Sequence, residues 1–308
     1  MTEIKLPQRK QNSHKGTYGK VLNIAGSPNY SGAAYLSSIS ALKVGCGYVA
    51  LASCPSVLQA VSAKSPDIVL IPIKQVKNVL KNYDVISFGC GFSTEAPAIL
   101  MFKSIMTELA ILDMPVILDA DGINLLAKFK KMVLPDRLIL TPHPKEASRL
   151  LNKPVSEILE NPEDSATEIS LNFKCTTVLK LHNTIVCSKK LTIYTNDTGN
   201  SALSKAGAGD VLCGMISGLL AQGLTPFEAC KTAVYLHGLS GELASKYLTE
   251  YSVLASDLIN YIPDSIRTLL NNWFVPLQLV ELRLYNLEHC SVFCRKCNSQ
   301  VVQMPLLL

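Results

Sequence analysis

The sequence predicts an α/β fold, a three-layer α/β/α sandwich in which helices cover both faces of a mostly parallel sheet. Short apolar runs rich in β-branched residues alternate with helical stretches along most of the chain, and this alternation is typical of a parallel sheet. A chain of 308 residues with 48% hydrophobic residues has enough apolar surface to fill such a core. The loops after the strands repeatedly contain Gly, Asp or His, and parallel sheets bind ligands at that edge.

The first half of the chain supplies the opening units of this sheet. Residues 20–25 form a short apolar strand, a Gly-Ser-Pro-Asn turn follows, and residues 31–45 predict a helix rich in small residues. No GxxxxGKS/T motif follows the strand, so it does not lead into a Walker-type nucleotide loop. Further strands are expected at residues 46–53, 67–73 and 84–88, with a helix at 95–109.

The second half carries polar side chains at the ends of its strands. A buried strand before Asp119 delivers Asp119 and Asp121 to its carboxyl end. The strand at residues 137–141 ends at Pro142-His143-Pro144, and a helix follows at 145–151. These loops are expected to share one rim of the sheet.

A hairpin and a capped helix complete the predicted elements. Residues 175–188 contain two β-rich runs separated by His182-Asn183, which predicts the hairpin. The later segment Thr225-Pro226-Phe227-Glu228 has a capping residue, a proline in the first helical position and a glutamate in the third. This pattern marks the start of a helix.

The segment AGAGD at residues 206–210 predicts an anion site. Small residues are followed by an apolar helical pattern, so a loop is expected to become a buried helix at Asp210. The first N–H groups of a helix lack intrahelical partners and carry partial positive charge, which suits a phosphate. A carboxylate beside that anion either accepts a proton from an attacking hydroxyl or caps the helix. The segment alone favours neither interpretation.

Composition argues against several classes of protein. The net charge of +5 is mild and the basic residues are scattered, so no nucleic-acid partner is expected. The uncharged runs at 21–42 and 44–63 contain Asn, Gly, Pro and Gln, so we interpret them as buried strand, loop and helix rather than membrane spans. The N-terminus lacks the apolar core of a signal peptide.

Seven of the ten cysteines occur singly within apolar segments, the pattern of reduced core thiols in a cytoplasmic protein. The other three, Cys290, Cys294 and Cys297, lie in the tail at residues 273–308, where the α/β alternation is lost. With His289 they resemble half of a zinc knuckle, but the second half-site is missing. We expect residues 1–272 to form the domain and 273–308 to be a poorly ordered, atypical C-terminal extension.

Several motifs together resemble one family, the NAD(P)H-hydrate dehydratases, which are relatives of the ribokinase-like sugar and vitamin kinases. The resemblance covers about residues 12 to 270 in the family's order. It implies a ribokinase-like sandwich. The motifs that carry it are KGxxGKVL at 15–22, YSGAA at 30–34, DADGIN at 119–124, LTPHPKE at 140–146, and GN at 199–200 with AGDVLCG at 208–214.

The resemblance implies repair of hydrated NADH or NADPH with ADP or ATP as phosphoryl donor and Mg²⁺ as cofactor. Phosphorylation turns the ring hydroxyl into a good leaving group, and elimination of phosphate restores the reduced ring. Asp210 would accept the hydroxyl proton while the amides around Ala208 and Gly209 stabilise the transferring group. The resemblance also implies that Ala33, Gly91, His143 and Asp210 contact the hydrated dinucleotide.

The resemblance also implies a nucleotide segment and a metal site. Its nucleotide residues are Lys180, Leu181, His182, Asn183, Thr184, Ala208 and Gly209. Two segments depart from the family, because Leu181 replaces a usual Gly and residues 89–93 read GCGFS instead of GPGLG. Asp119, Asp121 and Glu146 are candidates to hold Mg²⁺ through water, and the alternative is that they stabilise turns and caps.

Two alternatives to the lyase remain open. One is a kinase of the same superfamily that phosphorylates a small alcohol such as a vitamin precursor, and the other is a nucleotide-binding regulator without turnover. Retention of a base at Asp210 argues against the regulator. Because the match begins near the N-terminus, we expect the epimerase of the same pathway to be a separate chain. A homotetramer is an implication of the resemblance.

Overall fold

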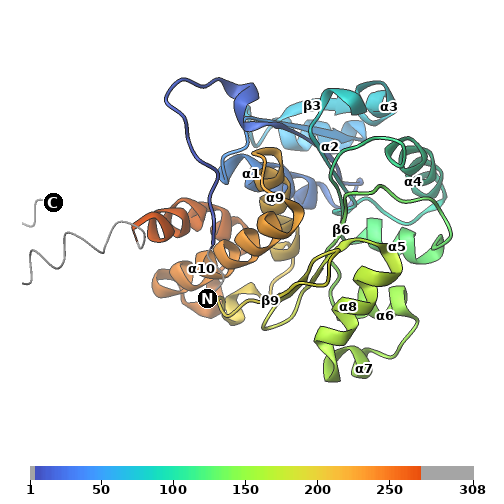
Figure 1. Cartoon of the computed structure of the whole chain (residues 1–308). Coiled ribbons are helices and arrows are strands. Elements are labelled where there is room, and N and C mark those ends of the chain that lie inside the picture. The colour runs from blue at the N-terminus through green and yellow to red at the C-terminus, as the bar shows by residue number, and fades with distance from the viewer. Residues whose placement is uncertain (1–3, 272–308) are drawn as a thin grey trace, which may run out of the picture. The chain divides into compact units, whose positions relative to one another are not determined.

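The computed structural model describes residues 4–271. The chain divides into two compact units, Met1–Ser265 and Ile266–Leu308, and the first contains the sheet and its helices (Figure 1). The predicted extension at 273–308 lies outside the described residues. Within the described part, no helix is long and apolar enough to cross a membrane.

The first unit is built on a nine-stranded sheet with the order β3-β2-β1-β4-β5-β6-β7-β8-β9. All neighbours from β3 to β7 pair in parallel, while β8 pairs antiparallel with both β7 and β9. The mostly parallel sheet and the hairpin are therefore confirmed. The strands are β1 (Lys20–Ile24), β2 (Tyr48–Ser53), β3 (Val69–Pro72), β4 (Val85–Phe88), β5 (Val116–Leu118), β6 (Leu138–Leu140), β7 (Thr176–Leu179), β8 (Ile185–Cys187) and β9 (Ile193–Thr195).

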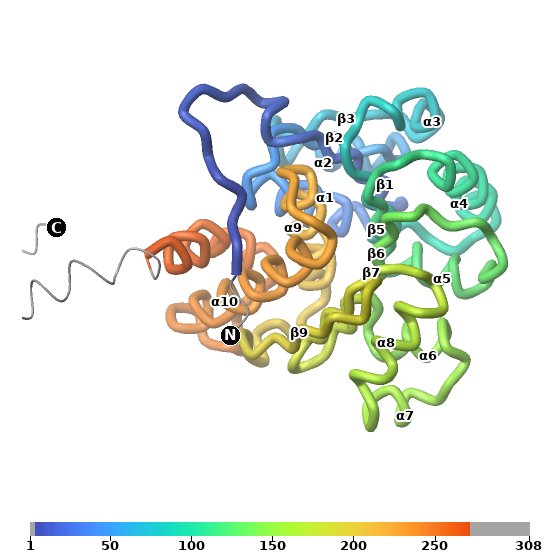
Figure 2. Tube along the Cα trace, viewed as in Figure 1, coloured from blue at the N-terminus to red at the C-terminus, as the bar shows by residue number. Residues whose placement is uncertain are grey.

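Helices cover both faces of this sheet. They are α1 (Ser31–Lys43), α2 (Pro55–Ser62), α3 (Val76–Val79), α4 (Ala96–Leu109), α5 (Asp121–Lys128), α6 (Pro144–Leu151), α7 (Val155–Glu160), α8 (Pro162–Phe173), α9 (Ala208–Ala221) and α10 (Pro226–Ser252). Figures 1 and 2 show α1, α9 and α10 on one side of the sheet and α4, α5, α6 and α8 on the other. This arrangement confirms the three-layer sandwich.

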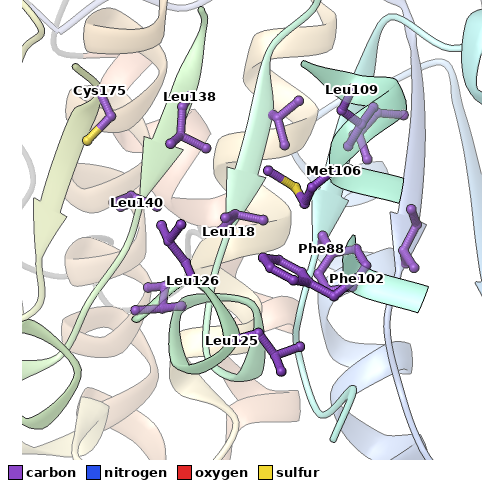
Figure 3. Close-up of a cluster of buried hydrophobic side chains, with 14 of the residues drawn as sticks. Phe88, Phe102, Met106, Leu109, Leu118, Leu125, Leu126, Leu138, Leu140 and Cys175 are labelled. Atoms are coloured by element: carbon purple, nitrogen blue, oxygen red, sulfur yellow. The ribbon is translucent and has the colours of Figure 1, made fainter. Parts of the chain in front are cut away.

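The core between the sheet and its α4/α5 face is made of large apolar side chains. Phe88 of β4 and Leu118 of β5 are fully buried, as are Phe102 and Met106 of α4. Figure 3 shows these side chains meeting between the strands and the helices. Phe88 and Phe102 pack edge to face with ring centroids 5.5 Å apart, a favourable geometry for aromatic pairs.

The opposite face depends on small residues because α1 and α9 approach each other closely. A Cβ at Gly214 would lie 2.1 Å from the backbone oxygen of Ser37, and one at Gly218 would lie 2.4 Å from that of Ala41. These distances exclude any side chain. The contact places the start of α9 beyond the carboxyl ends of β1 and β4, which α9 also contacts.

The structure corrects the predicted start of α9. The helix begins at Ala208 and not at Asp210, since Gly207 takes a left-handed conformation (φ 92°) as its N-cap residue. Asp210 is therefore the third helical residue, and the interpretation of its side chain as the cap is wrong. The sequence did not predict α2, α3, α7, α8 or β9.

Candidate functional site

The carboxyl edge of the parallel strands borders a cavity of about 980 Å³. Its lining includes three of the residues predicted to touch the hydrated dinucleotide, namely Ala33, Gly91 and Asp210. Two of the predicted metal residues, Asp121 and Glu146, also line it. Segments far apart in the sequence thus meet at one rim, as expected for a parallel sheet.

Ala33 and Gly91 lie against each other on one wall of this cavity. Gly91 has φ 62°, and a Cβ there would lie 2.9 Å from the Cβ of Ala33 and 2.6 Å from that of Tyr30. A larger residue at either position would displace this wall, so small residues allow a flat ligand to approach the backbone.

Asp210 enters the cavity from the first turn of α9. Burial raises the pKa of its carboxyl to about 6, and the negative charge of Asp119 adds to this rise, while a hydrogen bond from the Cys90 thiol and the charge of Lys180 oppose it. A carboxylate with this pKa is charged at neutral pH and still basic enough to accept a proton.

Lys180 lies beside this carboxylate and is held by a buried partner. It follows β7 directly, its Nζ donates to Asp119 Oδ1 at 2.6 Å, and Thr141 Oγ1 donates to the same oxygen at 2.7 Å. Burial disfavours the charged form of Lys180, but the carboxylates of Asp119 and Glu146 outweigh burial and raise its pKa. The ammonium therefore stays charged.

The same ammonium group faces the start of α9. A Cβ built on Gly209 would lie 3.4 Å from Lys180 Nζ. The Ala208 N–H donates to the Lys205 carbonyl at 3.2 Å, so the amides of Gly209 and Asp210 are the ones that the helix start offers to an anion. Lys180 and these amides together form a site suited to a phosphoryl group.

The predicted nucleotide segment lines a second cavity, of about 670 Å³. Leu181, His182 and Asn183 contribute to its lining, and Thr184 Oγ1 donates to the Leu181 carbonyl at 3.2 Å. Lys180, the first residue of this segment, is not in the lining of the second cavity. It faces Gly209 of α9 and so connects the second cavity to the helix start beside the first.

His143 makes capping hydrogen bonds that were not predicted from its motif. The imidazole Nδ1 accepts hydrogen bonds from the backbone N–H groups of Lys145 and Glu146 at 3.1 and 3.3 Å. The backbone N–H of His143 donates to Glu146 Oε2 at 2.8 Å. Burial and the charge of Lys180 lower the pKa of His143. The neutral imidazole is therefore the N-cap of α6. His143 does not line either of the two cavities. The His-Pro-x-Glu spacing, typical of a capping box, could have revealed this.

The three predicted metal residues have different surroundings. Asp121 Oδ2 accepts from the Ser93 N–H at 2.7 Å, which fixes the loop after β4. Burial raises the pKa of Glu146 to about 7. Asp119 is 1% exposed and uses its oxygens for Lys180, Thr141 and the Cys90 thiol.

His237 of α10 also supports the start of α9, and no sequence pattern singles it out. It is buried and hydrogen-bonded to the backbone of Ala208, and burial lowers its pKa to about 4. Its Nε2 has no hydrogen-bond partner within the described residues. The neutral imidazole of His237 therefore stabilises the first turn of α9, which carries Asp210.

The fold and the site together define an α/β enzyme of the ribokinase-like class, with a helix N-terminus, a lysine and a carboxylate at one rim of the sheet. A family model described as NAD(P)H-hydrate dehydratase matches residues 21–264. The chain belongs to the NAD(P)H-hydrate dehydratase family, as its motifs predicted.

Individual relatives agree with this assignment. An "ADP-dependent (S)-NAD(P)H-hydrate dehydratase" of Neisseria meningitidis is 38% identical over 76% of this chain and 80% of its own length. A Bacillus subtilis structure described as an ADP/ATP-dependent NAD(P)H-hydrate dehydratase co-crystallised with ATP/Mg²⁺ is 32% identical, with a TM-score of 0.78 over 86% of this chain and 94% of that one.

Other relatives are longer than this chain. A "Bifunctional NAD(P)H-hydrate repair enzyme" of Moorella thermoacetica is 32% identical over 86% of this chain. The chain spans about half the length of such bifunctional relatives, 52% and 53% in two of them.

Proposed function

We propose that this protein dehydrates hydrated NADH or NADPH back to NADH or NADPH, with ADP or ATP as the phosphoryl donor. The ring hydroxyl is first phosphorylated, and phosphate is then eliminated. The observation that carries this proposal is the position of Asp210. A carboxylate with a pKa of about 6 lines a large cavity at the start of a helix whose amides and neighbouring Lys180 suit a phosphoryl group.

In this proposal Asp210 accepts the proton of the ring hydroxyl as its oxygen attacks phosphorus. Its pKa near neutral suits a general base, because such a group is mostly ionised at working pH without being too weak. Ala33 and Gly91 form the wall on which the damaged ring lies. His143 caps α6 and its Nε2 lies 3.4 Å from Glu146 Oε1. We propose that the half-exposed side chain of His143 also contacts the dinucleotide.

The nucleotide is proposed to reach the same point from the second cavity. The segment Lys180–Thr184 would hold it, with Leu181 narrowing the entrance relative to glycine. Lys180 and the amides of Gly209 and Asp210 would face the transferring phosphoryl group, with Ala208 supporting that turn. Fixed positive charge at this position stabilises the charge that develops during transfer.

The residues of the cavity also fit magnesium. Carboxylate oxygens are the ligands that Mg²⁺ prefers, and Asp121 and Glu146 present two of them to the cavity. We propose that these two residues hold the ion through water. Asp119 would act indirectly, because it positions Lys180 through their hydrogen bond. When bound, the ion would neutralise charge on the donor phosphates.

The remaining parts of the proposal concern the whole protein. We propose that residues 1–272 are the catalytic domain, with 273–308 an extension that the chemistry does not need. We further propose a homotetramer and an epimerase activity in the same pathway that supplies the reactive epimer. A cytoplasmic location is supported by the seven cysteines within the described residues, all of which carry free thiols.

One assay tests the proposal. The purified protein is incubated with hydrated NADPH, Mg²⁺ and either ADP or ATP, and the absorbance of the reduced nicotinamide is followed together with phosphate release. We expect both signals with at least one nucleotide and neither without it. Absence of recovery with both nucleotides would reject the dehydratase. Stable phosphorylation of an added vitamin alcohol would instead support the kinase.

A further inference from the structure

Two thiols and a carboxylate that the proposed reaction does not use directly gather behind Asp210. Cys90 Sγ, Cys213 Sγ and a carboxylate oxygen of Asp119 lie within 4.8 Å of one another, and all three residues are buried. Cys90 Sγ is 3.7 Å from Asp119 Oδ2. Ligand atoms of a tetrahedral zinc site are about 3.4–3.8 Å apart, given metal–ligand bonds of about 2.0–2.3 Å.

Three separate elements bring these groups together. Cys90 lies in the loop after β4, Asp119 follows β5, and Cys213 is on α9 three residues after Asp210. We propose that Cys90, Cys213 and Asp119 form a binding site for a thiophilic divalent cation of the zinc class, next to the proposed catalytic base.

The carboxylate is oriented for this role. Asp119 Oδ1 accepts hydrogen bonds from Lys180 Nζ at 2.6 Å and Thr141 Oγ1 at 2.7 Å, while Oδ2 faces the Cys90 thiol. A metal-binding carboxylate is commonly held in this way through its second oxygen. One oxygen is therefore fixed and the other is directed at the cluster.

The thiols have a second layer of support as well. Ser87 Oγ lies 3.3 Å from Cys213 Sγ, within reach of a hydrogen bond to sulfur. The carboxylate of Asp210 also interacts with the Cys90 thiol, so the proposed base lies beside the cluster. Three protein ligands plus a fourth position is the usual pattern of an open zinc site.

Charge and ligand type select the cation. Two thiolates and one carboxylate carry a charge of −3, so a divalent cation leaves −1, which the ammonium of Lys180 balances. Sulfur ligands favour zinc, cadmium or cobalt over magnesium and calcium. On binding, the two thiols transfer their protons to the buffer as the metal–sulfur bonds form, and nothing is oxidised or reduced.

Cobalt(II) is a suitable probe because its thiolate complexes absorb light. The full chain would be studied with Cys290→Ser, Cys294→Ser and Cys297→Ser, so that tail cysteines give no signal, in oxygen-free buffer without nucleotide or dinucleotide. We expect one Co²⁺ per chain, a thiolate-to-cobalt charge-transfer band, and loss of that band when Zn²⁺ is added.

Variants in the same background locate the site. Cys90→Ser and Cys213→Ser should each abolish the band, and Asp119→Asn should weaken Co²⁺ binding at least tenfold, a loss on the order of those seen for metal-site variants. Cys46→Ala, which removes a buried thiol on the opposite end of β1 and β2, should leave the band unchanged.

Two results would overturn the proposal. One is no charge-transfer band in the background chain, and the other is a band that survives both Cys90→Ser and Cys213→Ser. The melting temperature of the background chain provides a test that needs none of these variants. Zn²⁺ should raise it, because the folded site binds the cation. An unchanged melting temperature would also contradict the proposed site. None of these measurements requires turnover, so their failure is distinct from failure of the proposed function.

Discussion

Replacing Asp210 with Asn should stabilise the fold while it removes activity. Folding raises the pKa of this carboxyl from 3.8 to about 6, and each unit corresponds to about 1.4 kcal/mol. Above pH 6 the charged carboxylate therefore lowers the free energy of unfolding by at most roughly 3 kcal/mol. Because the side chain has some access to solvent, we expect a value of about 1–3 kcal/mol. Asn has nearly the same shape without the charge, so the cost should disappear.

The sign of the pH dependence makes this prediction specific. The pKa is higher in the folded state, so the cost is absent below the unfolded pKa and is fully present above the folded one. The stabilisation by Asp210→Asn should be greatest near pH 7.5 and fall to about half near pH 5. Denaturant unfolding at both pH values measures it.

Turnover should respond in the opposite direction. Loss of a general base typically lowers the rate about 10²–10⁴-fold, while nucleotide binding should be retained. The surface variant Asp113→Asn is a matched control and should change stability by less than about 0.5 kcal/mol. A variant at position 210 that is no more stable than the parent at neutral pH, or whose gain does not vary with pH, would refute the reasoning.

Four further predictions follow from the same site. The turnover rate should fall as pH decreases through about 6, because Asp210 becomes protonated; a flat profile over pH 5–8 would contradict its role as base. Lys180→Met should cost about 3–5 kcal/mol by leaving Asp119 buried without its partner, and adding Asp119→Asn should recover part of this in denaturant unfolding. His143→Ala should cost about 1 kcal/mol through loss of the α6 cap, and His143→Asn, which can still cap, should cost less in the same melts. Truncation after Asn272 should preserve turnover in the absorbance assay, and loss of folding would contradict the proposed domain boundary.

The alternation of strands and helices could be predicted because buried parallel strands are nearly continuous apolar runs. The elements that were missed have weaker patterns. β9 has exposed and half-buried residues, and α8 begins Pro-Glu-Asp and is polar over much of its length. Neither segment has the apolar run or clear periodicity from which an element is inferred.

The site was predictable where a motif carries its chemistry and unpredictable where tertiary contacts decide. Asp210 and Gly91 were placed at the cavity from their motifs. The pairing of Asp119 with Lys180 joins residues 61 positions apart, and nothing in the local sequence of either residue specifies it. The cluster of Cys90 and Cys213 joins two segments in the same way, since each cysteine alone is simply a small apolar residue.

The most direct test of the proposed mechanism follows the oxygen of the ring hydroxyl. Hydrated NADPH prepared in water enriched in a heavy oxygen isotope carries the label in that hydroxyl, and the phosphate released during a single turnover is analysed by mass spectrometry. If Asp210 activates the hydroxyl for attack on phosphorus, the label should appear in the phosphate in a one-to-one ratio with NADPH regenerated. Label that appears in water, with unlabelled phosphate, would contradict phosphorylation of the substrate.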